Sequence, residues 1–294
     1  MKLLLTGAEG FTGRPFAQQA AAEGYEVVGL RADLTDREAL AREVREVAPE
    51  AVVHLAGIAF VGHAHEEAFY AVNVVGTTNL LDALLQLPRP PRRVLISSSA
   101  NIYGNSECSP LVETQPPSPV NHYAMSKLAM EYMARSYADR LDVVITRPFN
   151  YTGPGQDENF VIPKLAKHFA AKDEVIALGN IDVEREFNDI RMVCDAYLHL
   201  LRWGKPGEIY NVCSNRPFTL QHVIDTFTKL ANHRIRIEVD PRFVRSNEVH
   251  RLCGSADKLE TLLGRHGAML RSPPLEETLE RMLAHARSQL EAAS

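Results

Sequence analysis

Apolar runs and amphipathic segments alternate along the first half of the chain. Continuous apolar runs predict buried strands at residues 2–7, 25–30, 51–57, 93–99 and 142–150. Between them, helical periodicity predicts helices at residues 14–24, 35–49, 68–87 and 122–141. Gly24 is placed to end the first helix, and Thr35 is a candidate N-cap of the second. Unbroken apolar strands between helices predict a parallel sheet that is buried on both faces.

The pattern becomes less regular after Asn150. Helices are predicted at residues 160–173 and 185–203, and strands at residues 208–214 and 234–239. We therefore predict an α/β protein: a Rossmann-type doubly wound parallel sheet with a smaller C-terminal α/β substrate-binding domain. The first domain would comprise residues 1–150, and the chain would return to it around residues 188–214. The second, residues 151–294, would then be discontinuous.

Composition and charge narrow the class of protein. The chain has 294 residues, 45% of them hydrophobic and 23% charged, which is typical of a soluble globular protein. A net charge of −5 argues against nucleic-acid binding. The four cysteines lack metal-site spacing, so we expect free thiols in a reducing compartment and no metal. The first apolar run is too short for a signal peptide, and no run reaches the ~20 residues of a membrane span. We expect a cytoplasmic protein without a membrane partner.

A glycine-rich turn, "TGAEGFTG", directly follows the first predicted strand and opens the first helix. Gly7, Gly10 and Gly13 are spaced as in dinucleotide-binding turns, where glycines let the backbone approach a pyrophosphate and the helix pack closely on the strand. The helix N-terminus then faces the phosphates. The strand–turn–helix context predicts a dinucleotide site.

The end of the second strand bears on which cofactor is bound. An acidic residue there binds the ribose 2′-hydroxyl of NAD, whereas an arginine accommodates the 2′-phosphate of NADP. Arg31 comes first in "GLRADLTD", so NADPH is favoured. Asp33 is close enough to keep NAD as the other candidate.

A tyrosine and a lysine in "YAMSK" are candidate catalytic groups. Tyr123 and Lys127 are four residues apart, on one face of a predicted helix. A nearby ammonium and an oxidised nicotinamide ring both favour the phenolate, so we expect a pKa for Tyr123 below its usual value of about 10. Ser99 ends a predicted parallel strand one helix upstream, and ligands bind beyond the carboxyl ends of such strands. The hydroxyl and the phenol should therefore share one crevice.

These motifs together resemble the extended short-chain dehydrogenase/reductase superfamily. "TGAEGFTG", "HLAG", "SSSANIYG", "YAMSK" and "RPFN" occur in its order and spacing and cover most of the chain. The resemblance implies an NAD(P)-dependent enzyme in which Tyr123 is the acid/base and Ser99 polarises a substrate carbonyl. It implies that Lys127 tunes Tyr123 and binds ribose, and that Asn73 steadies the lysine. His54, in contrast, is interpreted as a structural core histidine.

The implied cofactor site draws on the glycine loop and on the ends of the strands that follow. Its residues are Gly7, Gly10, Phe11, Thr12, Gly13, Arg31, Asp33, Leu34, Leu55, Ala56, Gly57, Asn73, Tyr123, Lys127 and Pro148.

The pair after Ser99 separates two chemistries within the superfamily. Its 4,6-dehydratases carry threonine and then an acid/base pair, which removes a C5 proton and expels the C6 hydroxyl. Here the corresponding positions are Ala100 and Asn101. Alanine can do neither, and asparagine is no base, so dehydration is disfavoured. Hydride transfer by Ser–Tyr–Lys remains, either as simple reduction or as epimerisation through a ketone.

The second half resembles the branch of GDP-mannose dehydratases and GDP-4-dehydro-6-deoxy-D-mannose reductases. The resemblance implies reduction of GDP-4-dehydro-6-deoxy-D-mannose to GDP-D-rhamnose or to its C4 epimer. Guanidinium groups suit diphosphates, and carboxylates accept ribose hydroxyls. The implied substrate residues are Ser99, Ala100, Asn101, Tyr123, Asn150, Lys164, Arg185, Arg245 and Glu248.

Two alternatives stay open. "SSSA" is also found in UDP-hexose 4-epimerases, so an NAD-retaining epimerase is the second hypothesis, and a non-catalytic dinucleotide sensor is the remote one. His122 replaces the usual proline, and "RHGAML" replaces the familiar tail motif. Wide apolar faces on the helices at residues 68–87 and 122–141 predict a homodimer.

Overall fold

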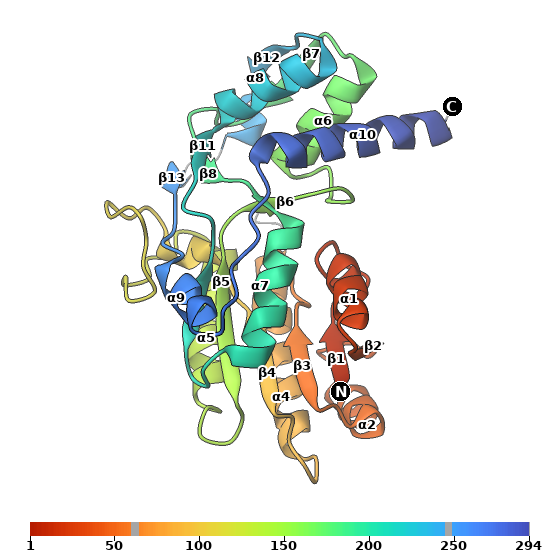
Figure 1. Ribbon diagram of the computed structural model, residues 1–294, viewed down its shortest axis with the longest axis vertical. Helices are drawn as coiled ribbons and strands as arrows, with labels where there is room; N and C mark the ends of the chain where they lie inside the picture. Colours follow the sequence, from red (N-terminus) through yellow and green to blue (C-terminus); the bar gives the residue numbers. More distant parts are fainter. Residues whose placement is uncertain (60–64, 245–248, 294) are drawn as a thin grey trace.

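Six parallel strands form the central sheet (Figure 1). The computed structural model describes residues 1–59, 65–244 and 249–293. The strand order is β10-β5-β4-β3-β1-β2, and every neighbouring pair is parallel. The strands are β1 (Lys2–Thr6), β2 (Glu26–Gly29), β3 (Ala51–His54), β4 (Arg93–Ser97), β5 (Val143–Pro148) and β10 (Ile209–Val212). The doubly wound sheet predicted from the sequence is confirmed, and β10 shows where the chain returns to it.

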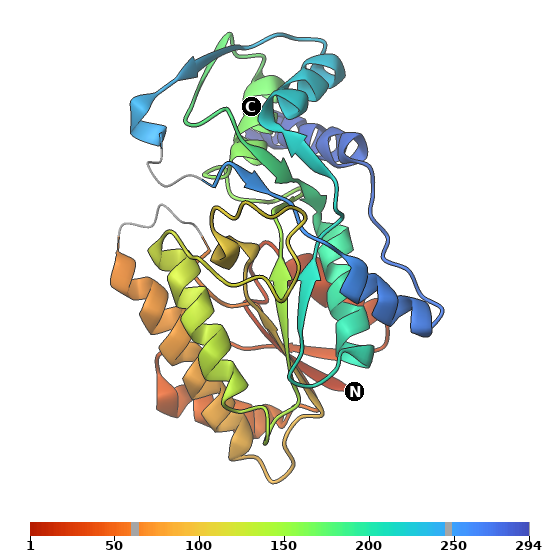
Figure 2. The same cartoon turned by 90° about the vertical axis from the view of Figure 1, so that its left-hand side faces the viewer.

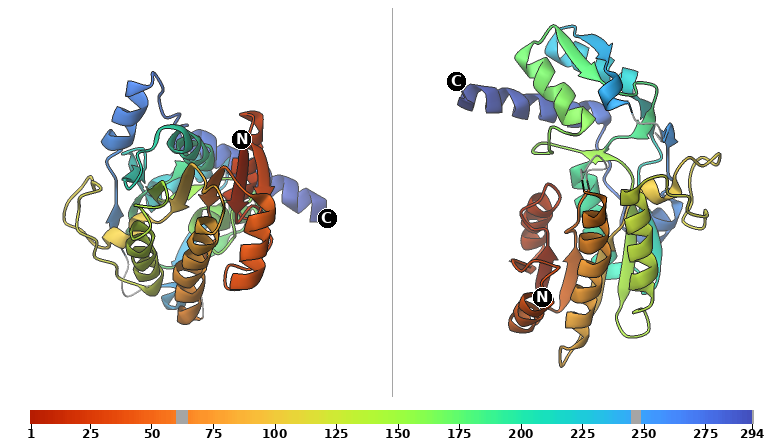
Figure 3. Two further views of the ribbon diagram at one scale, coloured as in Figure 1. Left: turned by 90° about the horizontal axis from the view of Figure 1, so that it is seen from below. Right: turned by 180° about the vertical axis from the view of Figure 1, so that it is seen from behind.

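Helices cover both faces of this sheet, as the apolar strands require. One face carries α1 (Gly13–Ala22) and α7 (Ile190–Trp203), with α9 (Asp257–Arg265) against α7. The other carries α2 (Arg37–Val47), α4 (Thr77–Leu85) and α5 (His122–Arg135), seen from behind in Figure 3. Successive residues of a strand point to opposite faces. Leu3 and Leu5 therefore pack in the core under α1 and α7, and Leu4 packs under α2, α4 and α5.

One long helical stretch contains a widened turn. It runs through α3 (Glu66–Tyr70), a π-helical segment η1 (Ala71–Gly76) and α4. Such π segments are frequent at functional sites, and this one carries Asn73. By length and composition alone, Glu66–Leu85 is apolar enough to cross a membrane, and half of it is buried in this fold, as in the core helix of a soluble protein.

A smaller helical part lies beyond the carboxyl ends of the central strands (Figure 2). Its helices α6 (Val161–Ala171), α8 (Leu220–Ala231) and α10 (Leu275–Ala293) share an apolar core, in which Phe169 stacks on Phe227. The short elements of this region and its junction with the sheet are β6 (Tyr151–Thr152), β7 (Val175–Leu178), β8 (Glu184–Glu186), β9 (Asn188–Asp189), β11 (Pro217–Thr219), β12 (Arg236–Val239), β13 (Arg251–Leu252), and the 3₁₀ turns η2 (Ala100–Tyr103) and η3 (Pro241–Phe243).

A buried carboxylate holds the two parts together. Glu186 accepts hydrogen bonds from the backbone N–H of Ser214, at 2.6 Å, and of Gly254, at 2.7 Å. The side-chain amide of Asn188 donates to it at 3.2 Å. Burial raises the pKa of Glu186, and these donors oppose that rise. The carboxylate thus joins β8 to the segments that follow β10 and β13.

Two local predictions were wrong. The helix predicted at residues 185–203 begins only at Ile190, because Asp189 caps it by accepting from the N–H of Arg191, and the preceding residues pair as β8 and β9. The N-cap of α2 is Asp36 rather than Thr35. Asp36 accepts from the N–H of Ala39, whereas the Thr35 hydroxyl donates to Asp33.

Candidate active site

The three serines at the carboxyl end of β4 have different surroundings. Ser97 shares a 2.9 Å hydrogen bond with the Tyr197 hydroxyl, and its carbonyl accepts the Lys127 ammonium. The Ser98 hydroxyl is buried and has no hydrogen-bond partner among the described residues. Ser99 has extended backbone geometry and caps η2. Only the third serine therefore turns toward the predicted crevice residue Tyr123.

The hydroxyl of Ser99 is oriented by its neighbour in the turn. Its oxygen accepts from the backbone N–H and from the side-chain amide of Asn101, both at 3.2 Å. These two N–H groups occupy the acceptor lone pairs, so the Ser99 proton is free to be donated. The Ser99 hydroxyl is near enough to Tyr123 to lower the pKa of the phenol. The structure thus brings the predicted serine and tyrosine together.

Burial opposes that effect on Tyr123. The ring is 7% exposed and packs 6.0 Å from the ring of Phe69. Removal from water disfavours the phenolate, and this larger effect raises the pKa of Tyr123 above its ordinary value. Within the protein itself, burial thus outweighs the effect of Ser99, and the lower pKa that we expect from Lys127 together with an oxidised nicotinamide stays a prediction. The helix is anchored by Asn121, whose side chain accepts from the N–H of Ala124 at 2.8 Å.

Lys127 is buried under the turn that follows β3. Its Nζ donates to the carbonyl of Ser97 at 2.9 Å. A Cβ added to Gly57 would lie 3.2 Å from this nitrogen. Burial lowers the pKa of Lys127 to about 8, while Glu131 on the next turn of α5 raises it. The ammonium is therefore poised to lose its proton in mildly alkaline solution.

The Asn73 side chain also contacts α5, the helix that carries Lys127. Its Oδ1 accepts from the N–H of Ile58 at 3.1 Å, and its Nδ2 donates to the Ser126 hydroxyl at 3.0 Å. Ser126 in turn donates to the carbonyl of Tyr123. Asn73 thus holds the helix that carries Tyr123 and Lys127, and its described hydrogen bonds go to Ile58 and Ser126 rather than to the ammonium.

The glycine loop has the shape that a pyrophosphate requires. Gly7 has φ +69°, a region that favours glycine. A Cβ at Gly13 would lie 2.0 Å from the Gly7 carbonyl oxygen, so only glycine lets the first turn of α1 pack here. The helix begins without a side-chain cap, and the positive end of its dipole lies at this loop, where it favours an anion. These features fit a dinucleotide.

Other predicted cofactor residues lie in this loop or near the carboxyl ends of the strands that follow. Phe11 stacks on Tyr151 with ring centroids 5.9 Å apart, and the Thr12 hydroxyl lies 2.8 Å from the Tyr151 hydroxyl. Leu34 is buried, and its carbonyl accepts from the Asn79 side chain. Leu55, Ala56 and Gly57 form the turn after β3, and Pro148 ends β5.

The turn after β2 is held by a carboxylate from α2. Glu43 accepts from the backbone N–H groups of Arg31, at 2.9 Å, and Ala32, at 2.7 Å. The Arg31 side chain is exposed, and Asp33 accepts from the hydroxyl and the N–H of Thr35. Both residues thus stand at the end of β2, where the sequence places the 2′ position of the cofactor ribose.

The predicted substrate residues are less closely grouped. Asn150 Oδ1 is buried without a hydrogen-bond partner among the described residues. Lys164 donates to the carbonyl of Ala177 at 2.7 Å and lies 4.3 Å from the centroid of the Phe243 ring. Arg185 is buried and donates to the carbonyls of Glu184 and Val249. Ala100 is buried, and Arg245 and Glu248 lie outside the described residues.

Three residues of the site were not singled out from the sequence: Ser97, Ser126 and Tyr151. Ser126 lies inside "YAMSK", and Tyr151 directly follows "RPFN", so position in a motif was an available signal for both. Nothing in the sequence signals Ser97, because its carbonyl rather than its side chain meets Lys127.

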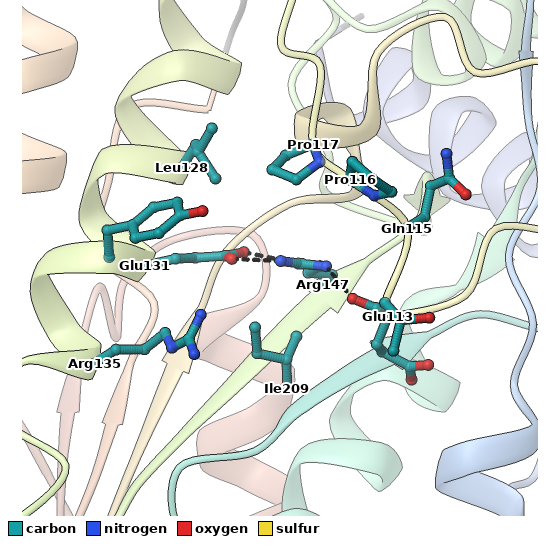
Figure 4. A pocket seen from close by; sticks show the side chains of 11 residues that line it. Glu113, Gln115, Pro116, Pro117, Leu128, Glu131, Arg135, Arg147 and Ile209 are labelled. Atoms are coloured by element: carbon teal, nitrogen blue, oxygen red, sulfur yellow. Dashed lines mark hydrogen bonds and ion pairs between the residues drawn. The ribbon is translucent and has the colours of Figure 1, made fainter.

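A pocket of about 140 Å³ lies between the later turns of α5 and the loop at residues 113–117 (Figure 4). Its wall holds a buried ion pair in which Glu131 accepts from Arg147 Nε at 3.0 Å and from one terminal nitrogen at 2.7 Å. Arg147 also donates to the Tyr103 hydroxyl and to the Glu113 carbonyl. These bonds connect α5 to β5.

Comparison with known proteins identifies the family. Residues 3–213 match the family described as NAD dependent epimerase/dehydratase. The chain belongs to this family. The resemblance to extended short-chain dehydrogenases/reductases is thereby confirmed, and so is the expectation of an enzyme that uses a nicotinamide cofactor. When bound to this family's fold, that cofactor would lie along the glycine loop described above.

Two relatives match nearly the whole chain. The GDP-6-deoxy-D-talose 4-dehydrogenase of Aggregatibacter actinomycetemcomitans is 34% identical over 269 residues, which cover 90% of this chain and 92% of that protein. The GDP-6-deoxy-D-mannose reductase of Pseudomonas aeruginosa is 34% identical over 278 residues, which cover 90% and 91%.

Solved structures agree with the fold. A protein of Burkholderia cenocepacia J2315 that is assigned as an epimerase is 45% identical with a TM-score of 0.91, and the match covers 98% of both chains. The Pseudomonas aeruginosa protein named RMD, whose structure was solved in complex with NADPH, is 32% identical with a TM-score of 0.89. The match covers 98% of this chain and 99% of that one. The chain is therefore that of an enzyme acting on nucleotide sugars within this family.

Proposed function

We propose that the protein reduces the 4-keto group of a GDP-4-dehydro-6-deoxy-hexose, converting GDP-4-dehydro-6-deoxy-D-mannose to GDP-D-rhamnose. The observation that carries this proposal is the assembly at the end of β4. Ser99 is near enough to Tyr123 to lower its pKa, while the positions that a dehydratase needs for acid and base hold Ala100 and Asn101. Asn101 is engaged in orienting Ser99, so the site can protonate an oxygen but has no second base there.

The chain's own groups supply the proton side of the reaction. A bound reduced nicotinamide would supply a hydride to C4. Tyr123 donates its phenolic proton to O4 as the carbonyl becomes an alkoxide, and Ser99 donates a hydrogen bond to the phenolate that remains. Lys127, one helical turn further along α5, would add positive charge on the same face of the helix. The bond order of C4–O4 falls by one, and the carbon and the oxygen each gain a hydrogen.

The preference for a GDP sugar is supported by the relatives. Both curated relatives named above carry GDP-6-deoxy-hexose in their names, one as a reductase and one as a dehydrogenase. Mannose-type and talose-type sugars differ at C4, so these two names describe one chemistry on two faces of the sugar. We assign residues 151–294 outside the sheet to the sugar nucleotide, with Asn150, Lys164 and Arg185 on its side of the cleft.

We propose NADPH as the cofactor, because Arg31 stands exposed at the end of β2. Asp33 lies on the same turn and Glu43 reaches it from α2, and both carboxylates add negative charge there. The ratio of activity with NADPH to activity with NADH is thus set by one arginine against two carboxylates.

A nucleotide-sugar 4-epimerase is the second candidate, and a specific observation favours it. The structure from Burkholderia cenocepacia, at 45% identity, is assigned as an epimerase. An epimerase uses the same Ser–Tyr–Lys groups but returns the hydride to the sugar. It would copurify with its cofactor and would consume none in turnover.

We also propose a homodimer formed through α5 and η1. Large apolar side chains are exposed on these helices: Val75 is 52% exposed, Met125 44% and Tyr132 62%. Their burial against a second copy would remove them from water. Light scattering that gives the mass of a single chain would contradict this proposal.

The deciding experiment is a turnover assay. GDP-4-dehydro-6-deoxy-mannose is generated by a separate dehydratase, and the loss of NADPH absorbance is followed after the protein is added. Stoichiometric loss establishes the reductase, and NMR of the product then assigns C4. No loss, together with interconversion of UDP- or GDP-hexoses by protein carrying bound NAD, establishes the epimerase instead.

A further inference from the structure

A buried histidine joins two parts of the site that the reaction must keep in register. The His54 side chain lies at the end of β3 and is 1% exposed. Its Nδ1 is 2.7 Å from the Thr6 hydroxyl, and its Nε2 is 2.8 Å from the Thr77 hydroxyl. Thr6 ends β1, directly before the glycine loop, and Thr77 begins α4, directly after the π segment.

The partners of the two threonines fix the direction of every bond. The Thr77 hydroxyl donates to the carbonyl of Asn73 at 2.6 Å, so it must accept from His54 Nε2–H. The Thr6 oxygen accepts from the N–H groups of Leu55 and Ala56, at 3.1 and 3.0 Å, which fills its lone pairs. Thr6 therefore donates its proton to His54 Nδ1. The ring is neutral and has a single tautomer.

The chain of bonds continues into the catalytic helix. From Asn73 it passes through Ser126 to the carbonyl of Tyr123. Thr6, His54, Asn73, Thr77 and Ser126 are all buried, so water cannot replace these partners. At one end the network holds the Leu55–Ala56 turn, and at the other it holds the peptide that carries the acid.

We propose that His54 is a positioning residue that sets the cofactor turn and the Tyr123–Lys127 helix relative to each other. One ring nitrogen holds Thr6 and thereby the Leu55–Ala56 turn. The other holds Thr77 and thereby Asn73 in its π-helical turn. An ordinary buried histidine would need only a partner for each nitrogen, whereas here both partners lead to groups of the reaction site.

The surroundings keep the ring in the form that this role requires. A proton on Nδ1 would face the Thr6 oxygen, which has no lone pair left to accept it. Burial and the positive charge of Lys127 lower the pKa of His54 to about 3. The network therefore stays intact over the pH range in which the protein is handled.

Two substitutions test the His54 bond to Thr77 and the His54 bond to Thr6 separately. His54→Asn keeps an acceptor near Nδ1 and loses the donor to Thr77. His54→Gln keeps a donor near Nε2 and loses the acceptor for Thr6. We expect His54→Asn to lower kcat roughly tenfold with little change in the affinity for NADPH, and His54→Gln to weaken NADPH binding roughly tenfold with a smaller change in kcat. NADPH binding is measured without sugar, by the fluorescence of the reduced nicotinamide.

If the histidine variants do not fold, two substitutions at Thr77 test the proposal instead. Thr77→Val removes the hydroxyl, and Thr77→Ser restores it. Thr78→Val is the matched control, because Thr78 donates to the carbonyl of Val74 in the same i−4 manner but lies outside the network. We expect kcat to fall in Thr77→Val and to be restored in Thr77→Ser. Equal losses of melting temperature in Thr77→Val and Thr78→Val, with unchanged kcat and NADPH affinity, would overturn the proposal.

The kcat measurements rest on the proposed reductase activity, whereas the measurements of NADPH binding do not. If the wild-type protein binds NADPH and turns over no GDP sugar, the proposed function fails. The His54 proposal is then judged by the loss of NADPH affinity in His54→Gln relative to His54→Asn. Equal NADPH affinity in these two folded variants would overturn it.

Discussion

The side-chain amide of Asn101 donates to the Ser99 hydroxyl oxygen at 3.2 Å, beside the backbone N–H of the same residue. Asn101 thereby turns the Ser99 proton toward Tyr123. The position that in dehydratases does chemistry on the sugar here contacts Ser99, the serine that we propose as catalytic. An amide is suited to this because it donates without competing for the serine proton.

Asn101→Asp should reverse this arrangement. A carboxylate accepts from Ser99, so Tyr123 loses the effect of the Ser99 hydroxyl that lowers its pKa and gains a nearby negative charge. In the direction of sugar oxidation, activity requires the phenolate and rises with pH. We expect this rise to move upward by about one pH unit or more in the variant. The measurement is a pH–rate profile with GDP-6-deoxy-hexose and NADP⁺, and an unmoved profile would show that Asn101 does not orient Ser99.

Tyr123→Phe should abolish reduction while leaving the fold intact. The change removes one hydroxyl and keeps the ring beside Phe69. General acid catalysis contributes about 10²–10⁴-fold, so kcat should fall by that factor. Tyr132→Phe is the control, because Tyr132 lies on the same helix and is 62% exposed. Undiminished turnover in Tyr123→Phe would refute the acid role.

Lys127→Met should stabilise the protein while it removes activity. Burial depresses the pKa of Lys127 from 10.5 to about 8, so charging it in the folded state costs about 3 kcal/mol, offset in part by the lost bond to Ser97. Below pH 8 that cost is fully present. It fades between pH 8 and 10.5, where the folded protein has released the proton and the unfolded chain still holds it.

The measurement is the urea midpoint of both proteins across this pH range. We expect Lys127→Met to be the more stable protein at pH 7, with a difference that shrinks toward pH 10. Lys167→Met is the control, since Lys167 forms an exposed pair with Glu158. A difference that stays constant from pH 7 to 10 would contradict a buried ammonium.

Gly13→Ala and Gly264→Ala should have opposite effects. A Cβ at Gly13 meets the Gly7 carbonyl at 2.0 Å, so the glycine loop must open and NADPH binding should be lost. At Gly264, within α9, a Cβ meets nothing within 4 Å, and the substitution should add about 0.5–1 kcal/mol of stability. Thermal unfolding and NADPH titration measure both. Normal NADPH affinity in Gly13→Ala would show that the loop does not contact the cofactor.

Sequence pattern predicted the elements whose signals are local. Unbroken apolar runs identified the parallel strands, because each strand is buried on both faces regardless of its neighbours. The pattern failed at residues 185–189, because two- and three-residue strands are specified by their partners rather than by their own periodicity. The residue types Ser99, Tyr123 and Lys127 were visible in motifs. The carbonyl of Ser97 and the direction of the His54 bonds were not, because they depend on how separate elements come together.

The buried ion pair between α5 and β5 gives a last prediction. Glu131 and Arg147 have side chains 2% and 5% exposed, so Glu131→Gln leaves a guanidinium buried without its counter-charge and should cost about 3 kcal/mol. The same change removes the negative charge that raises the pKa of Lys127, so loss of the ammonium should occur at lower pH. Glu131→Met combined with Arg147→Met should regain much of the stability, because neither charge is then buried alone. Urea unfolding measures the stability of Glu131→Gln and of the double variant. The alkaline limb of the pH–rate profile measures the change in the pKa of Lys127. If the limb does not move while stability falls, Glu131 supports the fold without tuning Lys127.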